Sequence, residues 1–150
     1  MTSDKRATLI EAISQAVWGN PFNRALDAEI AAVLQPGRIA YGDGFKGVRI
    51  ADAVAKYVDT DYGYLIGIAE IYGLPEFTAS VDAALSLLPA GFRFAVTGFE
   101  TPDPSDDSFS ASVDHVSGEL PAGRRPFGGA TGRTPAQALV KAILRTVEGA

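Results

Sequence analysis

A chain of 150 residues with 47% hydrophobic and 21% charged residues is long enough to bury a core, which argues against disorder of the whole chain. The net charge of −5 argues against direct binding to nucleic-acid backbones, which attract basic surfaces. The absence of cysteine excludes disulfides, thiolate nucleophiles and cysteine-ligated metals.

The sequence also argues against a membrane protein. The N-terminal segment carries Lys5, Arg6 and Glu11, unlike the uncharged apolar core of a signal peptide. The most apolar run, 62–74, is interrupted by Gly67 and Glu70 and is shorter than the ~20 residues of a spanning helix. We therefore expect a soluble, cytoplasmic protein with no membrane partner.

Two short helices are predicted at the N-terminus. Apolar residues recur at helical spacing over 4–17, where Ser3 is available as the N-cap. The second helix, 23–34, begins at Asn23 and is stopped by Pro36 and Gly37. The segment 1–37 is thus expected to form a helical hairpin.

The segment 38–73 is ambiguous. Apolar residues at i, i+3, i+4, i+7 and i+8 predict a helix over 48–58. After Thr60, a possible cap, Leu65, Ile68 and Tyr72 would share one face of a further helix. The same apolar run, with three glycines, equally fits a buried strand, because periodicity does not distinguish the two over so short a run.

The pattern changes after residue 74. Ser80 is placed to cap a helix over 81–88, and alternating apolar residues predict strands over 91–98 and 108–116. These strands form an antiparallel hairpin with a long acidic connection. The segment 120–132, rich in Gly, Pro and Arg, is either a loop or a distorted edge strand.

The last helix, 135–147, has the clearest signals. Thr134 is its expected N-cap, Pro135 occupies the first helical position, and Gln137 completes a capping box. Its wide apolar face is expected to pack on the sheet, because a face of this width needs a layer to cover it.

Three short sequence motifs resemble those of the phage ABA sandwich domain, a family of small bacteriophage and prophage proteins. They are R-x-L-D-A-x-I-A at 24–31, a Y-T-x-S-(apolar)-D-A-A-L pattern at 77–85 with Phe77 in the aromatic place, and T-P-A-x-A-L at 134–139. The resemblance implies an α+β fold, an α/β/α sandwich with a small central antiparallel sheet and flanking helices. It implies no activity or catalytic residues. We expect a single domain over 1–150, in which 38–73 is a possible insertion and 74–150 forms a helix–hairpin–helix core.

Other motifs have ordinary structural explanations. His115 is the only histidine, and its neighbour Asp114 points to the opposite face of a strand, so a catalytic triad is not expected. The G-x-G-x-x-G match at 42–47 has no βαβ units around it. The acidic cluster of Asp103, Asp106 and Asp107 lacks the spacing of a calcium loop.

The candidate binding site is the arginine- and glycine-rich segment before the last helix. Arg124, Arg125 and Arg133 could converge on the N–H groups that follow Thr134, with Gly128 and Gly129 allowing a ligand to approach the backbone. Helix N-termini attract anions, and arginine binds phosphate or carboxylate in a bidentate manner. The alternative is that Thr134 only caps the helix and the arginines keep an edge strand soluble.

These observations favour a phage-encoded accessory protein that acts by binding in the host cytoplasm. It would inhibit or sequester a host defence protein or a small anionic ligand, and it is a possible homo-oligomer. No cofactor or bound metal is expected. The alternatives are a metal-dependent enzyme on nucleotides that uses carboxylates such as Asp59 and Asp61, and a structural or assembly protein of the virion.

Overall fold

The computed structural model describes residues 3–16, 23–40, 47–57, 62–102, 107–115 and 127–146. The described residues divide into two compact units. Unit 1 contains those before residue 77, and unit 2 contains those from Phe77 onward. The predicted boundary between 73 and 74 lies close to this division. The single-domain organisation expected from the sequence stays a prediction.

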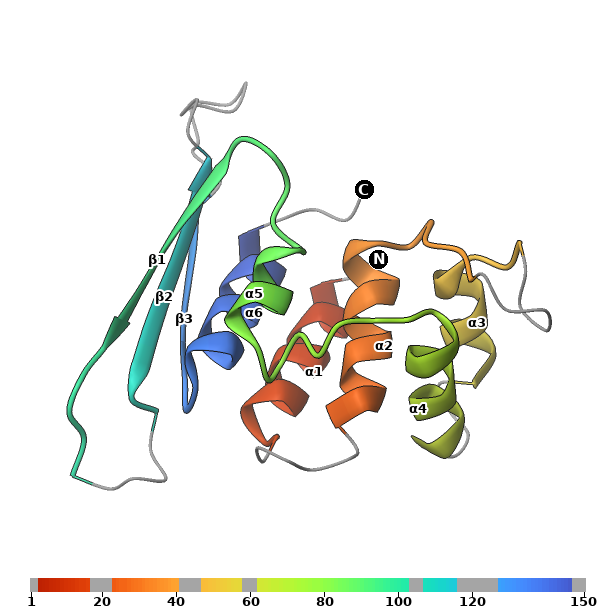
Figure 1. The fold of residues 1–150 in the computed structure, drawn as a ribbon. Helices are drawn as coiled ribbons and strands as arrows, with labels where there is room; N and C mark the ends of the chain where they lie inside the picture. The colour runs from red at the N-terminus through yellow and green to blue at the C-terminus, as the bar shows by residue number, and fades with distance from the viewer. Residues whose placement is uncertain are drawn as a thin grey trace. The chain divides into compact units, whose positions relative to one another are not determined.

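Unit 1 is helical. Its helices are α1 (Ser3–Ser14), α2 (Asn23–Leu34), α3 (Ile50–Tyr57) and α4 (Tyr62–Ile71). Helix α2 is the central one, since α1, α3 and α4 all pack against it (Figure 1). The side chains that fill this core are mostly aliphatic: Ile13, Ala25, Ile30, Ile50, Leu65 and Ile68.

Two helices lie between residues 48 and 73, and the second of them is the segment that the sequence left open between helix and strand. Helix α3 confirms the helix predicted over 48–58, although it begins at Ile50, two residues later than predicted. In α4, the predicted face of Leu65, Ile68 and the following Tyr72 is buried. The three glycines do not prevent the helix: Gly63 and Gly67 lie within it, and Gly73 ends it with φ +60°.

The end of α4 is a Schellman motif. The N–H of Leu74 donates to the carbonyl of Ala69 (2.9 Å), and the N–H of Gly73 donates to that of Glu70 (3.0 Å). This geometry requires a left-handed residue, which glycine adopts without steric cost. The glycine at 73 therefore sets the direction in which the chain leaves the helix.

Unit 2 contains a small sheet and two helices. Its elements are α5 (Val81–Leu85), β1 (Phe92–Gly98), β2 (Phe109–His115), β3 (Phe127–Gly132) and α6 (Pro135–Thr146). The strands are antiparallel in the order β1-β2-β3, with Phe94 opposite Val113 and Ala111 opposite Ala130. The mixed α+β class with a small antiparallel sheet is confirmed.

Within unit 2, α6 lies along the sheet and α5 packs on α6, on the same side (Figure 1). Ala111, Val113 and Ala130 are buried under α6. The helix lies mainly over β3 and β2 and touches β1 only at its margin. The described part of unit 2 therefore forms two layers, whereas the family resemblance implies three for the whole fold.

One predicted boundary is corrected, and one open alternative is decided. Helix α5 ends at Leu85 instead of residue 88, because Ser86, Leu87 and Leu88 bond to carbonyls three residues back, ahead of Pro89. Residues 127–132, which the sequence left open between a loop and a distorted edge strand, form the paired strand β3. The caps predicted at Ser80 and Thr134 are confirmed: the Ser80 hydroxyl accepts from the N–H of Ala83, and the Thr134 hydroxyl accepts from the N–H of Gln137.

None of the helices in the described part of the chain is long and apolar enough to cross a bilayer.

Candidate functional site

The start of α6, where the sequence predicts an anion site, is a capped helix end. The hydroxyl of Thr134 accepts from the N–H of Gln137 (3.2 Å), and Pro135 has no N–H to offer. The structure thus uses one of the N–H groups that the prediction assigned to a ligand. Arg133 beside it is exposed.

The predicted site residues are only partly brought together. Arg124 and Arg125 lie outside the described residues. Gly128 and Gly129 lie in β3, opposite Val113 and Ser112. Gly129 is three residues, about 10 Å, from Gly132 along the strand.

Gly129 instead lies beside the last turn of α6. Its carbonyl accepts a hydrogen bond from Arg145 Nη1 (2.7 Å), at the opposite end of the helix from Thr134. Gly128 and Gly129 therefore do not join Arg133 and Thr134 around the start of α6. Anion binding at Arg133 and Thr134 stays a prediction.

A different glycine of this segment has a clear structural function. A Cβ on Gly132 would lie 2.7 Å from the backbone nitrogen of Ala138 and 3.1 Å from its Cα. Only glycine allows the end of β3 to approach the first turn of α6 this closely. Part of the glycine content of the segment thus reflects packing of strand against helix.

The other constellations from the sequence give no site in the described residues. Asp59, Asp61, Asp103 and Asp106 lie outside them, as does 42–46 of the glycine motif. Asp107 accepts a hydrogen bond from the Thr131 hydroxyl (2.7 Å). Within the described ranges, no three His, Asp or Glu residues are grouped so as to hold a metal ion.

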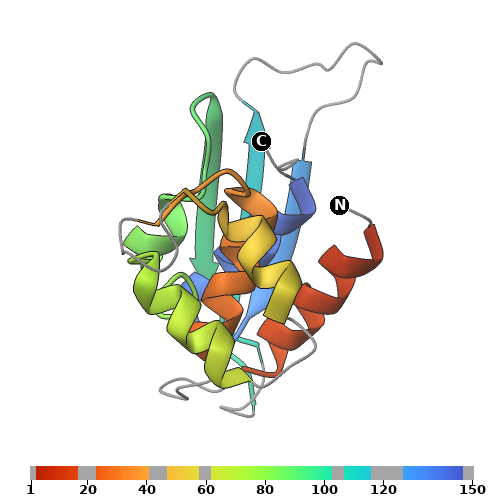
Figure 2. The same ribbon diagram turned by 90° about the vertical axis from the view of Figure 1, so that its right-hand side faces the viewer.

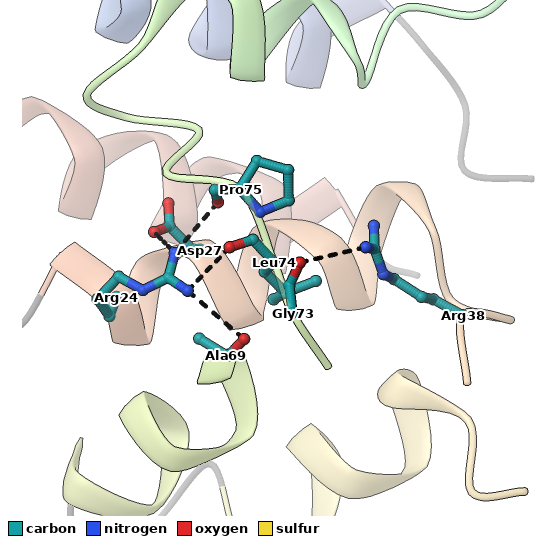
Figure 3. Close-up of polar contacts among 7 residues, drawn as sticks. All are labelled: Arg24, Asp27, Arg38, Ala69, Gly73, Leu74 and Pro75. Carbon is teal, nitrogen blue, oxygen red and sulfur yellow. Dashed lines mark hydrogen bonds and ion pairs between the residues drawn. The ribbon is translucent and has the colours of Figure 1, made fainter. Parts of the chain in front are cut away.

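A polar cluster that sequence reasoning missed lies in unit 1, around Arg24 (Figure 3). Its guanidinium donates to Asp27 Oδ2 (2.8 Å) within α2. It also donates to the carbonyls of Leu74 (2.8 Å) and Pro75 (3.2 Å), and at the limit of a hydrogen bond to that of Ala69 (3.5 Å). One side chain of α2 thus holds the segment that follows α4.

This cluster gives a structural reason for the R-x-L-D motif at residues 24–27. Asp27 is 1% exposed, and Arg24 is largely covered. A buried carboxylate requires a paired cation, and a helix C-terminus favours positive charge. Arg24 both pairs with the buried carboxylate and places a positive charge at the C-terminal end of α4. The arginine and aspartate of this motif therefore stabilise the fold of unit 1.

Two further contacts hold the same end of α4. Arg38 donates to the carbonyl of Gly73 (3.5 Å), as Figure 3 shows. The Tyr72 hydroxyl donates to the carbonyl of Val48 (2.6 Å). Burial, with a smaller contribution from the charge of Asp52, raises the pKa of Tyr72 above its ordinary value of 10.0.

Strand β1 lies at one edge of the sheet in unit 2. It is an edge strand, since it pairs with β2 alone in the described sheet. Phe94 points to the same side as the buried Val113, yet it remains 44% exposed because α6 covers β3 and β2 instead. This edge therefore combines an open backbone with an accessible aromatic side chain.

The direction of the backbone groups in β1 follows from the ladder. The N–H of Phe99 donates to the carbonyl of Ser108 (2.8 Å), in the same register as the β1–β2 pairs. Hydrogen-bonded and non-hydrogen-bonded pairs alternate in antiparallel sheets. The N–H and C=O groups of Phe94, Val96 and Gly98 therefore point away from β2, toward the open edge.

The two edge strands of this sheet, β1 and β3, differ in how their backbone groups are protected from pairing. On β3, the carbonyl of Gly129 is occupied by Arg145. Along β1 there is no proline and no bulge, and its one charged residue, Arg93, is bound to Asp114 by two bonds of 2.9 Å. That hydrogen bond also raises the pKa of Arg93. Edge strands are usually protected by proline, lysine or bulges, so β1 is open to pairing.

Comparisons with known proteins identify no relative: no family model, no curated protein and no solved structure matches the chain.

Proposed function

We propose that the chain is a phage-encoded accessory protein that acts by binding a host protein, without catalysing a reaction. The phage origin is supported by the resemblance of the segments 77–85 and 134–139 to the phage ABA sandwich domain. Ser80 and Thr134 of these segments cap helices of unit 2. The observation that carries the binding function is the open edge of β1. A protein partner adds an extended segment to this edge as a fourth strand.

The chemistry of the edge selects this kind of partner. The outward N–H and C=O groups of Phe94, Val96 and Gly98 alternate in the pattern that another strand satisfies. On the side that faces α6, Phe94 offers an apolar contact. The added segment is therefore an extended peptide with an apolar residue opposite Phe94, and backbone hydrogen bonds supply much of its affinity.

Two substitutions at one position test the edge. Val96→Pro removes an N–H that points to the open edge and leaves the bonds to β2 intact, because those are made by Ala95 and Thr97. Val96→Ala shortens the same side chain and keeps the N–H. We expect Val96→Ala to retain the partner and Val96→Pro to lose it.

The assay has two stages. Affinity capture from infected cells with the wild type and both variants identifies proteins that depend on the N–H of residue 96. Amide hydrogen exchange of the purified complex then measures protection at Phe94, Val96 and Gly98. We expect slower exchange at these amides on binding.

Three results would contradict the proposal. The first is a partner retained equally by Val96→Pro, and the second is a complex that leaves the three amides unprotected. The third is a β1 edge that pairs only with a second copy of the chain, which would appear as a dimer lost in Val96→Pro.

A further inference from the structure

Helix α4 of unit 1 is apolar at nearly all of its positions. Its sequence, Tyr62 to Ile71, contains one charged residue, Glu70. A helix that is apolar all round is normally enclosed by other elements. In this chain α4 packs on α2 and α3, with Leu65 and Ile68 buried on that side.

The opposite side of α4 is exposed. Tyr64 is 57% exposed and Ile71 is 40% exposed, one helical turn on either side of Gly67. Figure 2 shows α4 and α3 next to each other at the front of unit 1, with α2 behind them. We call the side formed by Tyr64, Gly67 and Ile71 the outer face of α4.

Gly67 makes no close packing contact with the part of the chain that the structure describes. A Cβ added to it would meet no atom within 4 Å. A glycine inside a helix is about 1 kcal/mol less favourable than alanine. A reason to keep it is a backbone from another molecule that approaches this point closely, as glycine permits.

The aromatic side chain of this face packs against a second aromatic ring. The ring of Tyr64 stacks on that of Tyr57 from α3, with centroids 5.1 Å apart and planes inclined by 10°. Lys56 Nζ lies 5.4 Å from the centroid of the Tyr57 ring. A positive charge is therefore held near the N-terminal end of α4, whereas Glu70 lies near its C-terminal end.

We propose that the outer face of α4 binds the same face of a second copy, with the two helices antiparallel and crossing at Gly67. Tyr64 precedes Gly67 by three residues and Ile71 follows it by four. An antiparallel pair therefore places Tyr64 of each copy opposite Ile71 of the other. The two glycines allow the close approach that brings these side chains into contact.

Charge selects the antiparallel arrangement. It brings Glu70 of each copy toward the end of α4 where Lys56 of the other copy lies, which is favourable twice by symmetry. It separates the two Glu70 residues by about 9 Å along the axis, six positions at about 1.5 Å each. A parallel pair would instead place the two carboxylates opposite each other.

A charge exchange tests the arrangement in the full chain. Sedimentation equilibrium over a wide range of concentration measures the dimer constant. We expect Glu70→Lys and Lys56→Glu to weaken the wild-type dimer about tenfold each, because each places like charges together. The double variant restores opposite charges and should recover the wild-type constant.

A second pair of variants tests the crossing point. Gly67→Leu fills the space at the crossing and should abolish the dimer. Ala7→Leu adds similar bulk to an exposed site on α1 and should leave the dimer unchanged. Circular dichroism confirms that both variants fold.

The proposal is overturned by a wild type that stays monomeric, by a dimer that persists in Gly67→Leu, or by a double charge variant as weak as the single ones. Val96→Pro separates this surface from the edge of β1. It should leave the dimer intact while it removes the host partner, so each proposal can fail independently.

Discussion

Removal of the Arg24 side chain should destabilise unit 1 far more than removal of a superficially similar arginine. Arg24→Ala deletes the bonds to Asp27 and to the carbonyls of Leu74 and Pro75. Removing one member of a buried ion pair costs about 3–5 kcal/mol. Because the Arg24 side chain is 19% exposed, we expect the lower part of this range, about 3 kcal/mol.

The matched control is Arg49→Ala. Arg49 also pairs with an aspartate three residues later, Asp52, at 3.2 Å, but the two side chains are 64% and 60% exposed. Exposed pairs contribute about 0–1 kcal/mol. The contrast between the two variants therefore isolates burial and the carbonyl contacts from the bare Arg–Asp pairing.

Urea unfolding followed by circular dichroism at 222 nm measures both free energies of unfolding. Arg24→Met combined with Asp27→Leu should be less harmful than Arg24→Ala, because no buried carboxylate is then left without this cation. An Arg24→Ala effect as small as that of Arg49→Ala, or a double variant worse than the single one, would refute the reasoning.

Three further outcomes follow from single contacts. Gly132→Ala should destabilise unit 2 by about 1–3 kcal/mol, because the new Cβ meets the backbone of Ala138. Thermal unfolding measures this loss, and an unchanged melting temperature would show that the strand shifts away from the helix. Thr134→Ala should cost about 1 kcal/mol through loss of the α6 cap, and an unchanged urea midpoint would exclude this function of the hydroxyl. The raised pKa of Tyr72 means that the folded state holds the phenolic proton more tightly than the unfolded state does. The contribution of this proton to folding stability is therefore complete below pH 10.0 and is lost as the pH rises through the higher pKa of the folded state. Tyr72→Phe should therefore lose less stability than the wild type in melts above pH 10.0, and equal losses would contradict the assignment.

Local signals were sufficient for most elements of the fold. The caps at Ser80 and Thr134 and the alternation of Phe92, Phe94 and Val96 are properties of neighbouring residues, and each appears where the sequence predicts it. Helix α4 was ambiguous because its apolar residues are not confined to one face, so no period of 3.6 or 2 stands out.

Long-range features were not predictable. Apart from Asp27, the acceptors of Arg24 are backbone carbonyls 45 to 51 residues away, and a carbonyl carries no signature in the sequence. The placement of Gly128 and Gly129 depended on whether their segment was a loop or a strand, which the sequence left open. The exposure of Phe94 depends on the position of α6 over the sheet, and strand alternation does not encode it.

The open edge of β1 also has a consequence for the behaviour of the isolated protein in solution. A strand edge that accepts a segment of a partner is also able to pair with the identical strand of a second molecule when no partner is present. The net charge of −5 keeps molecules apart at neutral pH, but this repulsion vanishes near the isoelectric point of about 4.8. Mildly acidic, concentrated solutions should therefore favour edge-to-edge pairing of β1 with β1 of a second molecule, which uses both open edges and stops at a dimer. The edge that suits the protein for recognition thus also favours self-association under acidic conditions when no partner is present.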